Sequence, residues 1–242
     1  MRFDGRKATE LRPVLLARGI ADFAEGSCQA QFGRTIVYCT ASVEQQTPRW
    51  RKAEEGGWIT GEYDMLPRAN RERKQRGGNR NGRALEISRL IGRSLRAVAD
   101  LSRMPGLTIT LDCDVLQGDG GTRTAAITGS YVALADALAW CRDRGLIKAD
   151  PLLDSVAAIS VGLVNGQALL DLCYEEDSAA SADANFVITG QGRLVEVQIT
   201  GEEATFDEAD IQRLLALAKK GTAVLKKLQR QALEMPPLRQ GD

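Results

Sequence analysis

The chain has 242 residues, of which 43% are apolar, and its 32 basic residues balance its 32 acidic residues. That length and apolar content are sufficient for a large hydrophobic core, in one domain or in two closely joined lobes. The chain contains no histidine, which excludes Ser-His-Asp hydrolysis, histidine acid/base cleavage of RNA and HExxH zinc sites. Any catalysis must therefore depend on arginine, lysine, carboxylates, hydroxyls, thiols, backbone amides or a metal ion.

The apolar runs and the cysteines predict the compartment. No run approaches the roughly 20 apolar residues of a membrane span, and the N-terminal stretch MRFDGRKATELRP lacks the apolar core of a signal peptide. We therefore expect a cytoplasmic protein without a membrane partner. We interpret the cysteines, which include no CxxC pair, as reduced core residues and not as a disulfide or zinc framework. They are Cys28, Cys39, Cys113, Cys141 and Cys173.

The first third of the chain predicts a small sheet, a long loop and a helix. Residues 28–43 (CQAQFGRTIVYCTASV) favour strands and are interrupted at Gly33, which indicates two antiparallel strands around a turn. Residues 67–82 have almost no apolar side chain and predict a loop. Residues 83–103 have the apolar spacing of an amphipathic helix. The residues of its apolar face are Leu90, Ile91, Leu95, Val98 and Leu101.

The middle of the chain predicts a strand that passes through a glycine-rich turn into a helix. Residues 107–115 alternate strictly between apolar and polar side chains, which is typical of a half-buried strand. The turn GDGGTRT follows, and residues 125–144 predict the helix.

The last third of the chain predicts two hairpins and a helix. The dipeptide Asn165-Gly166 between two apolar runs is a strong hairpin signal, because both residues tolerate positive φ. A second hairpin is expected around Gly190 and Gly192, and a helix is expected to start near Asp207. The pattern as a whole predicts an α/β protein with mixed sheets and packed helices.

Three segments carry residues suited to chemistry, and the first is GDGGTRTA at residues 118–125. Backbone amides at a helix N-terminus form an anion site, to which Thr122 adds a hydroxyl and Arg123 a forked cation. The segment matches neither the P-loop pattern nor GxGxxG. The alternative is an ordinary strand-to-helix turn, in which the glycines only permit the backbone conformation and no anion binds.

The second segment is the arginine run between residues 68 and 83. It contains seven basic residues against the single acid Glu72. Six of the seven are arginines, and guanidinium forks suit phosphate oxygens better than ammonium groups do. Such a run would hold an RNA backbone without reading its sequence. The alternative is a solvated face. The basic residues are Arg68, Arg71, Arg73, Lys74, Arg76, Arg80 and Arg83.

The third segment is the acidic stretch DLCYEEDSAASAD at residues 171–183. Two carboxylates brought together by a bend would suffice for Mg²⁺, which keeps several of its waters. The alternative is an acidic, solvated strand end. An anion cradle, a polyanion grip and a carboxylate pair are together what phosphoryl transfer requires of a protein. The acids are Asp171, Glu175, Glu176, Asp177 and Asp183.

Longer motifs are more specific than composition or spacing. They are LRPV at Leu11, AEGS at Ala24, FGRTIVYCTASVE at Phe32, GWITGEYDMLPR at Gly57, LEISRLIGRSLRA at Leu85, TLDCDVLQGDGGTRTAAITG at Thr110, YEEDSAASADAN at Tyr174 and VEVQIT at Val195. Together these motifs resemble the ribonuclease PH family of phosphorolytic exoribonucleases. The resemblance extends from about Arg2 to the C-terminal helix.

The resemblance implies a ribosomal-protein-S5-domain-2-like α/β fold, with residues 1–242 as a single domain. It implies a ring-shaped homo-hexamer built as a trimer of dimers. It also implies that orthophosphate attacks the last 3′ phosphodiester of RNA, chiefly tRNA precursors, and releases a nucleoside diphosphate in a reversible reaction.

The resemblance also implies roles for particular residues. The residues that would hold the phosphate are Arg83, Gly121, Thr122 and Arg123. Asp177 and Asp183 would hold Mg²⁺ or assist proton transfer, and with Arg83 they would form the catalytic set. The residues that would guide RNA are Arg68, Arg73 and Arg76.

Two other readings of the sequence remain. One is a catalytic core of the polynucleotide phosphorylase or archaeal exosome type, with the same chemistry in a different assembly. The other is an inactive RNA-binding subunit of an exosome-like ring. The joint presence of Arg83, Arg123, Asp177 and Asp183 argues against the inactive subunit.

Overall fold

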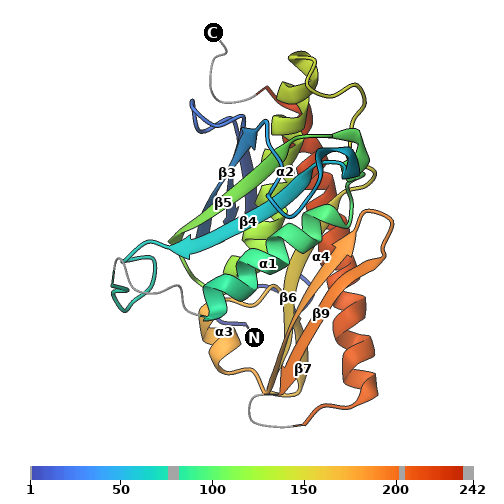
Figure 1. Ribbon diagram of the computed structural model, residues 1–242. Coiled ribbons are helices and arrows are strands. Elements are labelled where there is room, and N and C mark those ends of the chain that lie inside the picture. The colour runs from blue at the N-terminus through green and yellow to red at the C-terminus, as the bar shows by residue number, and fades with distance from the viewer. Residues whose placement is uncertain (1, 76–81, 202–204, 237–242) are drawn as a thin grey trace.

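The computed structural model describes residues 2–75, 82–201 and 205–236. Its strands form two sheets (Figure 1). The first sheet has the order β1-β2-β3-β5-β4, with β1 at Val14–Arg18, β2 at Gly26–Phe32, β3 at Thr35–Glu44, β4 at Trp58–Met65 and β5 at Thr108–Gln117. The second has the order β7-β6-β8-β9, with β6 at Val156–Val164, β7 at Gln167–Leu170, β8 at Ala182–Thr189 and β9 at Leu194–Gly201.

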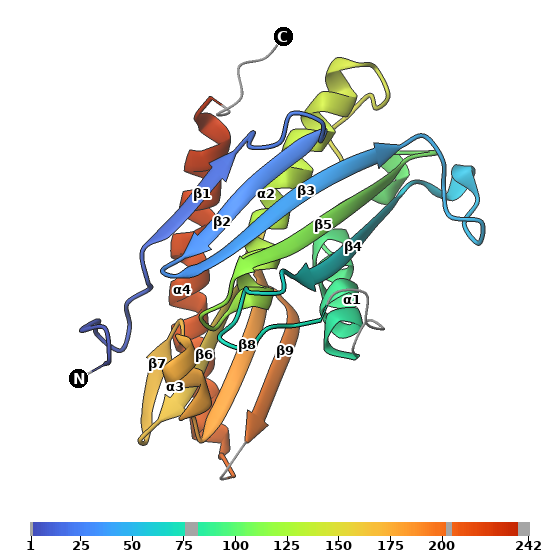
Figure 2. The same cartoon turned by 90° about the vertical axis from the view of Figure 1, so that its left-hand side faces the viewer.

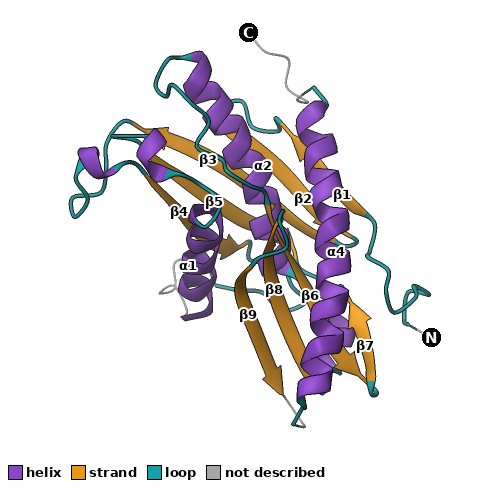
Figure 3. Cartoon of the chain, turned by 90° about the vertical axis from the view of Figure 1, so that its right-hand side faces the viewer, coloured by secondary structure: helices purple, strands orange, loops and turns teal. Residues whose placement is uncertain are grey.

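The helices connect and cover these sheets. Helix α2 packs on β2, β3 and β5 of the first sheet and also on β6 of the second, whereas α1 packs on β4. Helix α4 lies along β6 and β7 and beside α2 (Figure 3). The helices are α1 at Gly82–Arg96, α2 at Thr122–Asp143, α3 at Tyr174–Ser178 and α4 at Glu208–Glu234, with short 3₁₀ turns η1 at Ala53–Glu55 and η2 at Leu101–Arg103.

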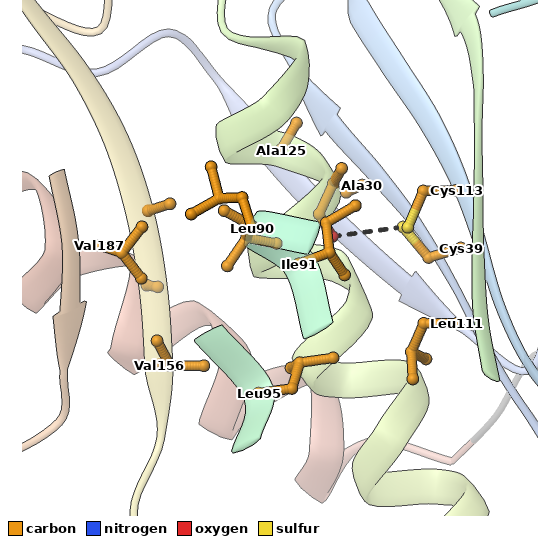
Figure 4. Close-up of a cluster of buried hydrophobic side chains, with 14 of the residues drawn as sticks. Ala30, Cys39, Leu90, Ile91, Leu95, Leu111, Cys113, Ala125, Val156 and Val187 are labelled. Atoms are coloured by element: carbon orange, nitrogen blue, oxygen red, sulfur yellow. Dashed lines mark hydrogen bonds between the residues drawn. The ribbon is translucent and has the colours of Figure 1, made fainter. Parts of the chain in front are cut away.

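One hydrophobic core runs between the two sheets. Leu90 and Ile91 of α1 lie between Val187 of β8 on one side and Cys39 and Cys113 of the first sheet on the other (Figure 4). Because both sheets share this core, the glycine turn after β5 is held in a defined position relative to β6 and β8. No helix of the described residues is long and apolar enough to cross a membrane.

Several elements confirm the sequence pattern. Residues 28–43 form antiparallel strands around Gly33, and the alternating segment 107–115 lies mostly in β5, with its apolar side chains buried. Asn165 and Gly166 have φ of 51° and 73° and connect β6 to β7. The expected hairpin of β8 and β9 is present, and Asp207 caps α4 by accepting a hydrogen bond from Asp210 N over 2.8 Å. All five cysteines are free and buried, as expected.

The helix predicted for residues 83–103 was too long, because it ends at Arg96. Beyond that point the backbone bonds to a distant segment: Asp100 N donates to Pro151 O and Leu153 N donates to Val98 O, each over 2.8 Å. These tertiary hydrogen bonds replace the helical ones. Helix α2, in turn, begins three residues before the predicted Ala125, and strands β1 and β4 and helix α3 were not expected.

Candidate active site

Two adjoining cavities of about 750 and 770 Å³ lie where the start of α1, the start of α2 and helix α3 approach one another. Both cavities are lined by Arg83, Gly121, Thr122 and Asp177, so they form one continuous cleft. The first cavity extends under the loop between β4 and α1. The second extends over β8 and β9. Figure 2 shows the described part of this loop, up to residue 75, close to α3 and the end of β5.

The glycine turn between β5 and α2 has a backbone conformation that favours glycine. Gly120 and Gly121 have φ of 76° and 65°, in the left-handed region that favours glycine. A Cβ on Gly120 would lie 2.6 Å from Leu172 O and 2.8 Å from the carbonyl carbon of Cys173. The turn is therefore pressed against the backbone that leads into α3. This contact brings the first turn of α2 and the acidic helix α3 to the same cleft.

A buried ion pair between Arg12 and Asp171 stabilises the glycine turn. Asp171 is fully buried, and its carboxylate accepts from Arg12 Nη2 over 2.7 Å, from Nε over 3.1 Å and from Arg12 N over 2.8 Å. Burial alone would lower the pKa of Arg12, but the charge of Asp171 and its hydrogen bond raise it, so the guanidinium stays protonated. Arg12 Nη1 then donates to Asp119 O over 2.6 Å. Thr35 Oγ1 adds a hydrogen bond to Gly120 O over 2.7 Å.

The expected phosphate ligands lie around the start of α2. Thr122 is the first residue of α2, and its hydroxyl oxygen accepts from the buried Tyr63 Oη over 2.8 Å. Because Tyr63 is the donor, the hydroxyl hydrogen of Thr122 is not used in this bond. The unpaired amides and the dipole at the start of a long helix favour an anion here. Arg83 lies in the first turn of α1 and is exposed in the cleft.

The side chain of Arg123 donates hydrogen bonds to two residues of the second cavity region. Its Nη1 donates to Gln198 Oε1 over 2.5 Å and to Glu86 Oε1 over 3.2 Å. The side chain is only 16% exposed, so its fork is oriented by β9 and by α1. Sequence reasoning missed the supporting residues Tyr63, Glu86 and Gln198. All three lie inside the family-like motifs, but no spacing rule links them to the glycine turn.

The two expected metal ligands come from different elements. Asp177 belongs to α3 and Asp183 to β8, and both line the second cavity. The described residues hold no cluster of three His, Cys, Asp or Glu side chains suited to a metal. A pair of carboxylates still fits Mg²⁺, which proteins bind through one or two carboxylates together with substrate phosphates and waters.

Helix α3 is attached to the N-terminal segment by a second buried pair. Arg2 Nε and Nη2 donate to the two carboxylate oxygens of Glu176 over 2.7 and 2.6 Å. Burial raises the pKa of Glu176, but hydrogen bonds from Arg2 and from Cys173 N outweigh it, and the net pKa lies below the ordinary value. Asp177 is the next residue along the chain, so this Arg2–Glu176 clamp also limits where the backbone of Asp177 can lie.

The arginine run approaches the cleft from the loop between β4 and α1. Arg68 and Arg73 both line the first cavity, together with Arg71 and Lys74. Arg76, the third residue expected to guide RNA, lies outside the described residues. Lys74 pairs with Asp64 and Arg71 with Glu175, so part of the loop is attached to β4 and to α3.

Comparison with known proteins gives the family of the chain. The model of the 3′ exoribonuclease family, domain 1, matches residues 10–139, and that of domain 2 matches residues 154–221. Ribonuclease PH of Methylobacterium radiotolerans is 55% identical over 236 residues, which cover 96% of this chain and all of the relative. Ribonuclease PH of Methylocella silvestris matches at the same identity and coverage.

Solved structures share the fold at lower identity. The rice (Oryza sativa) Rrp46 structure has a TM-score of 0.77 at 22% identity and covers 96% of this chain and 100% of its own. The Archaeoglobus fulgidus exosome with RNA bound to its active site has a TM-score of 0.78 at 21% identity, over 95% of this chain and 92% of its own.

The chain therefore belongs to the 3′ exoribonuclease family. The mixed α/β fold expected from the sequence is confirmed by the two sheets and by these structural neighbours. The chain is a phosphorolytic 3′ exoribonuclease, as the match to ribonuclease PH over nearly its whole length supports.

Proposed function

We propose that the chain trims the 3′ ends of tRNA precursors in the cleft between α1, α2 and α3, with orthophosphate as co-substrate and Mg²⁺ as cofactor. One observation carries this proposal: every residue expected to hold phosphate or metal lines the second cavity. They are Arg83, Gly121, Thr122, Arg123, Asp177 and Asp183.

In this proposal, orthophosphate binds at the start of α2. The amides of the glycine turn, the hydroxyl of Thr122 and the guanidinium groups of Arg83 and Arg123 orient it against the RNA backbone. Two anions must be placed side by side, and fixed positive charge in a partly enclosed site offsets their repulsion. The buried pair of Arg12 and Asp171 keeps the turn in position for this.

The exchange breaks one bond and forms one bond. A phosphate oxygen attacks the phosphorus of the last phosphodiester, the bond to the 3′ oxygen of the preceding nucleotide breaks, and a nucleoside diphosphate leaves. The freed 3′ oxygen takes up a proton. Because a phosphodiester is replaced by a diphosphate linkage, the reaction is reversible, and phosphate concentration sets its direction.

Asp177 and Asp183 would hold the metal ion, as their shared cavity and their oxygen donors suit a hard cation. Mg²⁺ would supply charge neutralisation at the reacting phosphates. Alternatively, one of these two carboxylates would assist the transfer of the proton to the freed 3′ oxygen.

Arg68, Arg73 and Arg76 would hold the body of the RNA while its 3′ end enters the cleft. Arg68 and Arg73 support this role because they line the first cavity, which continues into the second. Their contacts would be with phosphates and would not read sequence.

We further propose that residues 1–242 act as one domain in a homo-hexamer in the cytoplasm. The core shared by the two sheets supports a single unit, and buried free cysteines suit a reducing compartment. Light scattering tests the assembly.

The central experiment measures products from a tRNA precursor with and without orthophosphate. We expect nucleoside diphosphates only when phosphate is present. Nucleoside monophosphates released without phosphate would identify a hydrolase. Binding of RNA without release of any nucleotide would identify an inactive RNA-binding subunit.

A further inference from the structure

An aromatic ring lies among the arginines of the first cavity. Tyr174 is the first residue of α3, and 51% of its surface is exposed. It lines the same cavity as Arg68, Arg73 and Asp177. The exchange reaction has no step that uses this ring, so its exposure in the cleft calls for another explanation.

The backbone that carries the ring is held firmly. Cys173 N donates to Glu176 Oε2 over 3.1 Å, and Arg2 binds Glu176 in turn. On the other side, a Cβ on Gly120 would lie 3.0 Å from Tyr174 N, so the glycine turn packs against this backbone. A ring on a fixed backbone loses little conformational freedom when a ligand stacks on it.

Arg71 covers the ring only loosely. Its guanidinium carbon is 5.7 Å from the centroid of Tyr174, whereas the corresponding distances are 4.2 Å for Arg96 on Trp58 and 4.1 Å for Arg144 on Trp140. The side chain of Arg71 is also 79% exposed. Its ion pair with Glu175 is solvent-exposed, and such pairs contribute little to stability. Arg71 can therefore exchange Glu175 for a nucleic-acid phosphate while a flat ligand takes its place on the ring. Aromatic rings beside arginines are the usual means of holding single-stranded nucleic acid.

The ring and the proposed metal ligand lie on one face of the helix. Tyr174 and Asp177 are three residues apart, which places their Cβ atoms roughly 5–6 Å from each other. A nucleotide whose phosphate reacts beside Asp177 would therefore have its base, or that of its neighbour, at Tyr174. Stacking tolerates all four bases, as an enzyme that removes successive nucleotides requires.

We propose that Tyr174, assisted by Arg71, is a stacking site for a base at the single-stranded 3′ end of the RNA. This inference rests on the proposed function, because it takes the reacting phosphate to lie beside Asp177. Tyr174 is a binding residue in this scheme and takes no part in proton transfer.

The test uses short single-stranded RNAs that carry 2-aminopurine at the last or the next-to-last nucleotide, because the fluorescence of this base is quenched when it stacks. Without phosphate, the parent protein and Tyr174→Phe should quench at least one of the two labels, and Tyr174→Leu should not. With phosphate, Tyr174→Leu should raise the KM for RNA about 5- to 150-fold, the range of one base–aromatic stack. The KM for phosphate should stay at the parent value.

Tyr174→Phe is the matched control, since it keeps the ring and removes only the hydroxyl. Quenching of both labels by Tyr174→Leu to the parental extent would overturn the proposal. So would loss of quenching in Tyr174→Phe, because the hydroxyl and not the ring would then be the ligand. Tyr174→Trp provides a second variant with a larger ring, and it should quench at least as strongly as the parent. Release of nucleoside diphosphate by the parent protein tests the proposed function separately.

Discussion

Asp177 and Asp183 reach the same cavity from α3 and β8. We predict that Asp177→Asn or Asp183→Asn lowers kcat by about a hundredfold or more, as is typical when a catalytic charge is removed. RNA binding should persist, because the arginines are unchanged. Turnover kinetics and an RNA titration on the same variant test this, with the exposed Asp143→Asn as control. Near-parental turnover would remove the substituted residue from the site.

Arg123 differs from the arginines of the loop because its fork is already oriented by Gln198 and Glu86. We predict that Arg123→Ala raises the KM for phosphate about tenfold to a hundredfold, since a hydrogen bond to a charged group contributes about 1.5–3 kcal/mol. The KM for RNA should change less. Arg142→Ala, outside both cavities, is the matched control. An unaltered phosphate dependence in Arg123→Ala would place the phosphate site elsewhere.

The glycine turn is the element that connects the two halves of the cleft. We predict that Gly120→Ala raises the KM for phosphate and destabilises the fold by more than the roughly 1–2 kcal/mol of a left-handed alanine. The added Cβ would meet Leu172 O at 2.6 Å. Gly145→Ala is the control, because its φ of 71° imposes the same backbone strain with no atom within 4 Å. Equal effects of the two substitutions on the phosphate dependence would contradict the role of the turn.

Substitutions in the loop between β4 and α1 distinguish RNA binding from the chemical step. We predict that replacing Arg68, Arg73 and Arg76 together by glutamine weakens binding of a tRNA precursor. The salt dependence should become shallower by about two to three counterions. Short oligonucleotides should lose less, because they reach the cleft without spanning the loop.

The control for the loop replaces Arg142, Arg213 and Arg230, which lie outside both cavities. An unchanged salt slope in the loop variant would indicate a solvated loop. Loss of the assembly in light scattering, with equal losses on long and short substrates, would indicate a role in assembly.

At the scale of the whole molecule, the N-terminal segment is attached to helix α3 through Arg2 and Glu176. The pKa of Glu176 is lowered in the folded protein, so its contribution to stability is complete above its ordinary pKa of 4.5. That contribution is lost as pH falls through the lower pKa of the folded state. The clamp should therefore weaken only in acid.

We predict that Glu176→Gln lowers the free energy of unfolding near neutral pH by about 3–5 kcal/mol, because it leaves Arg2 buried without its counter-charge. The difference from the parent should shrink as pH falls below 4.5, because the folded parent is itself protonated as pH passes its lowered pKa. Urea unfolding at a series of pH values measures this, with the exposed Glu208→Gln as control. A difference that stays constant into acid would contradict the clamp.

Local patterns in the sequence were sufficient for most elements. The alternation in residues 107–115, the Asn165-Gly166 turn and the helix start near Asp207 are short-range features, and their conformations follow from neighbouring residues. The acids at 177 and 183 were selected from five by resemblance alone, because spacing along a strand and a short helix does not show which carboxylates face one cavity.

Tertiary structure decided which segments far apart in the sequence contact one another. Helix α1 ends at Arg96 because residues 98–100 bond to residues 151–153, a pairing that no local pattern contains. The glycine turn is held by Arg12 and Asp171, which are 159 residues apart. Such contacts depend on which surfaces the core brings together. The sequence by itself therefore determined which reactive side chains this chain has. Packing of the two sheets around one core determined which of them lie together in one cleft.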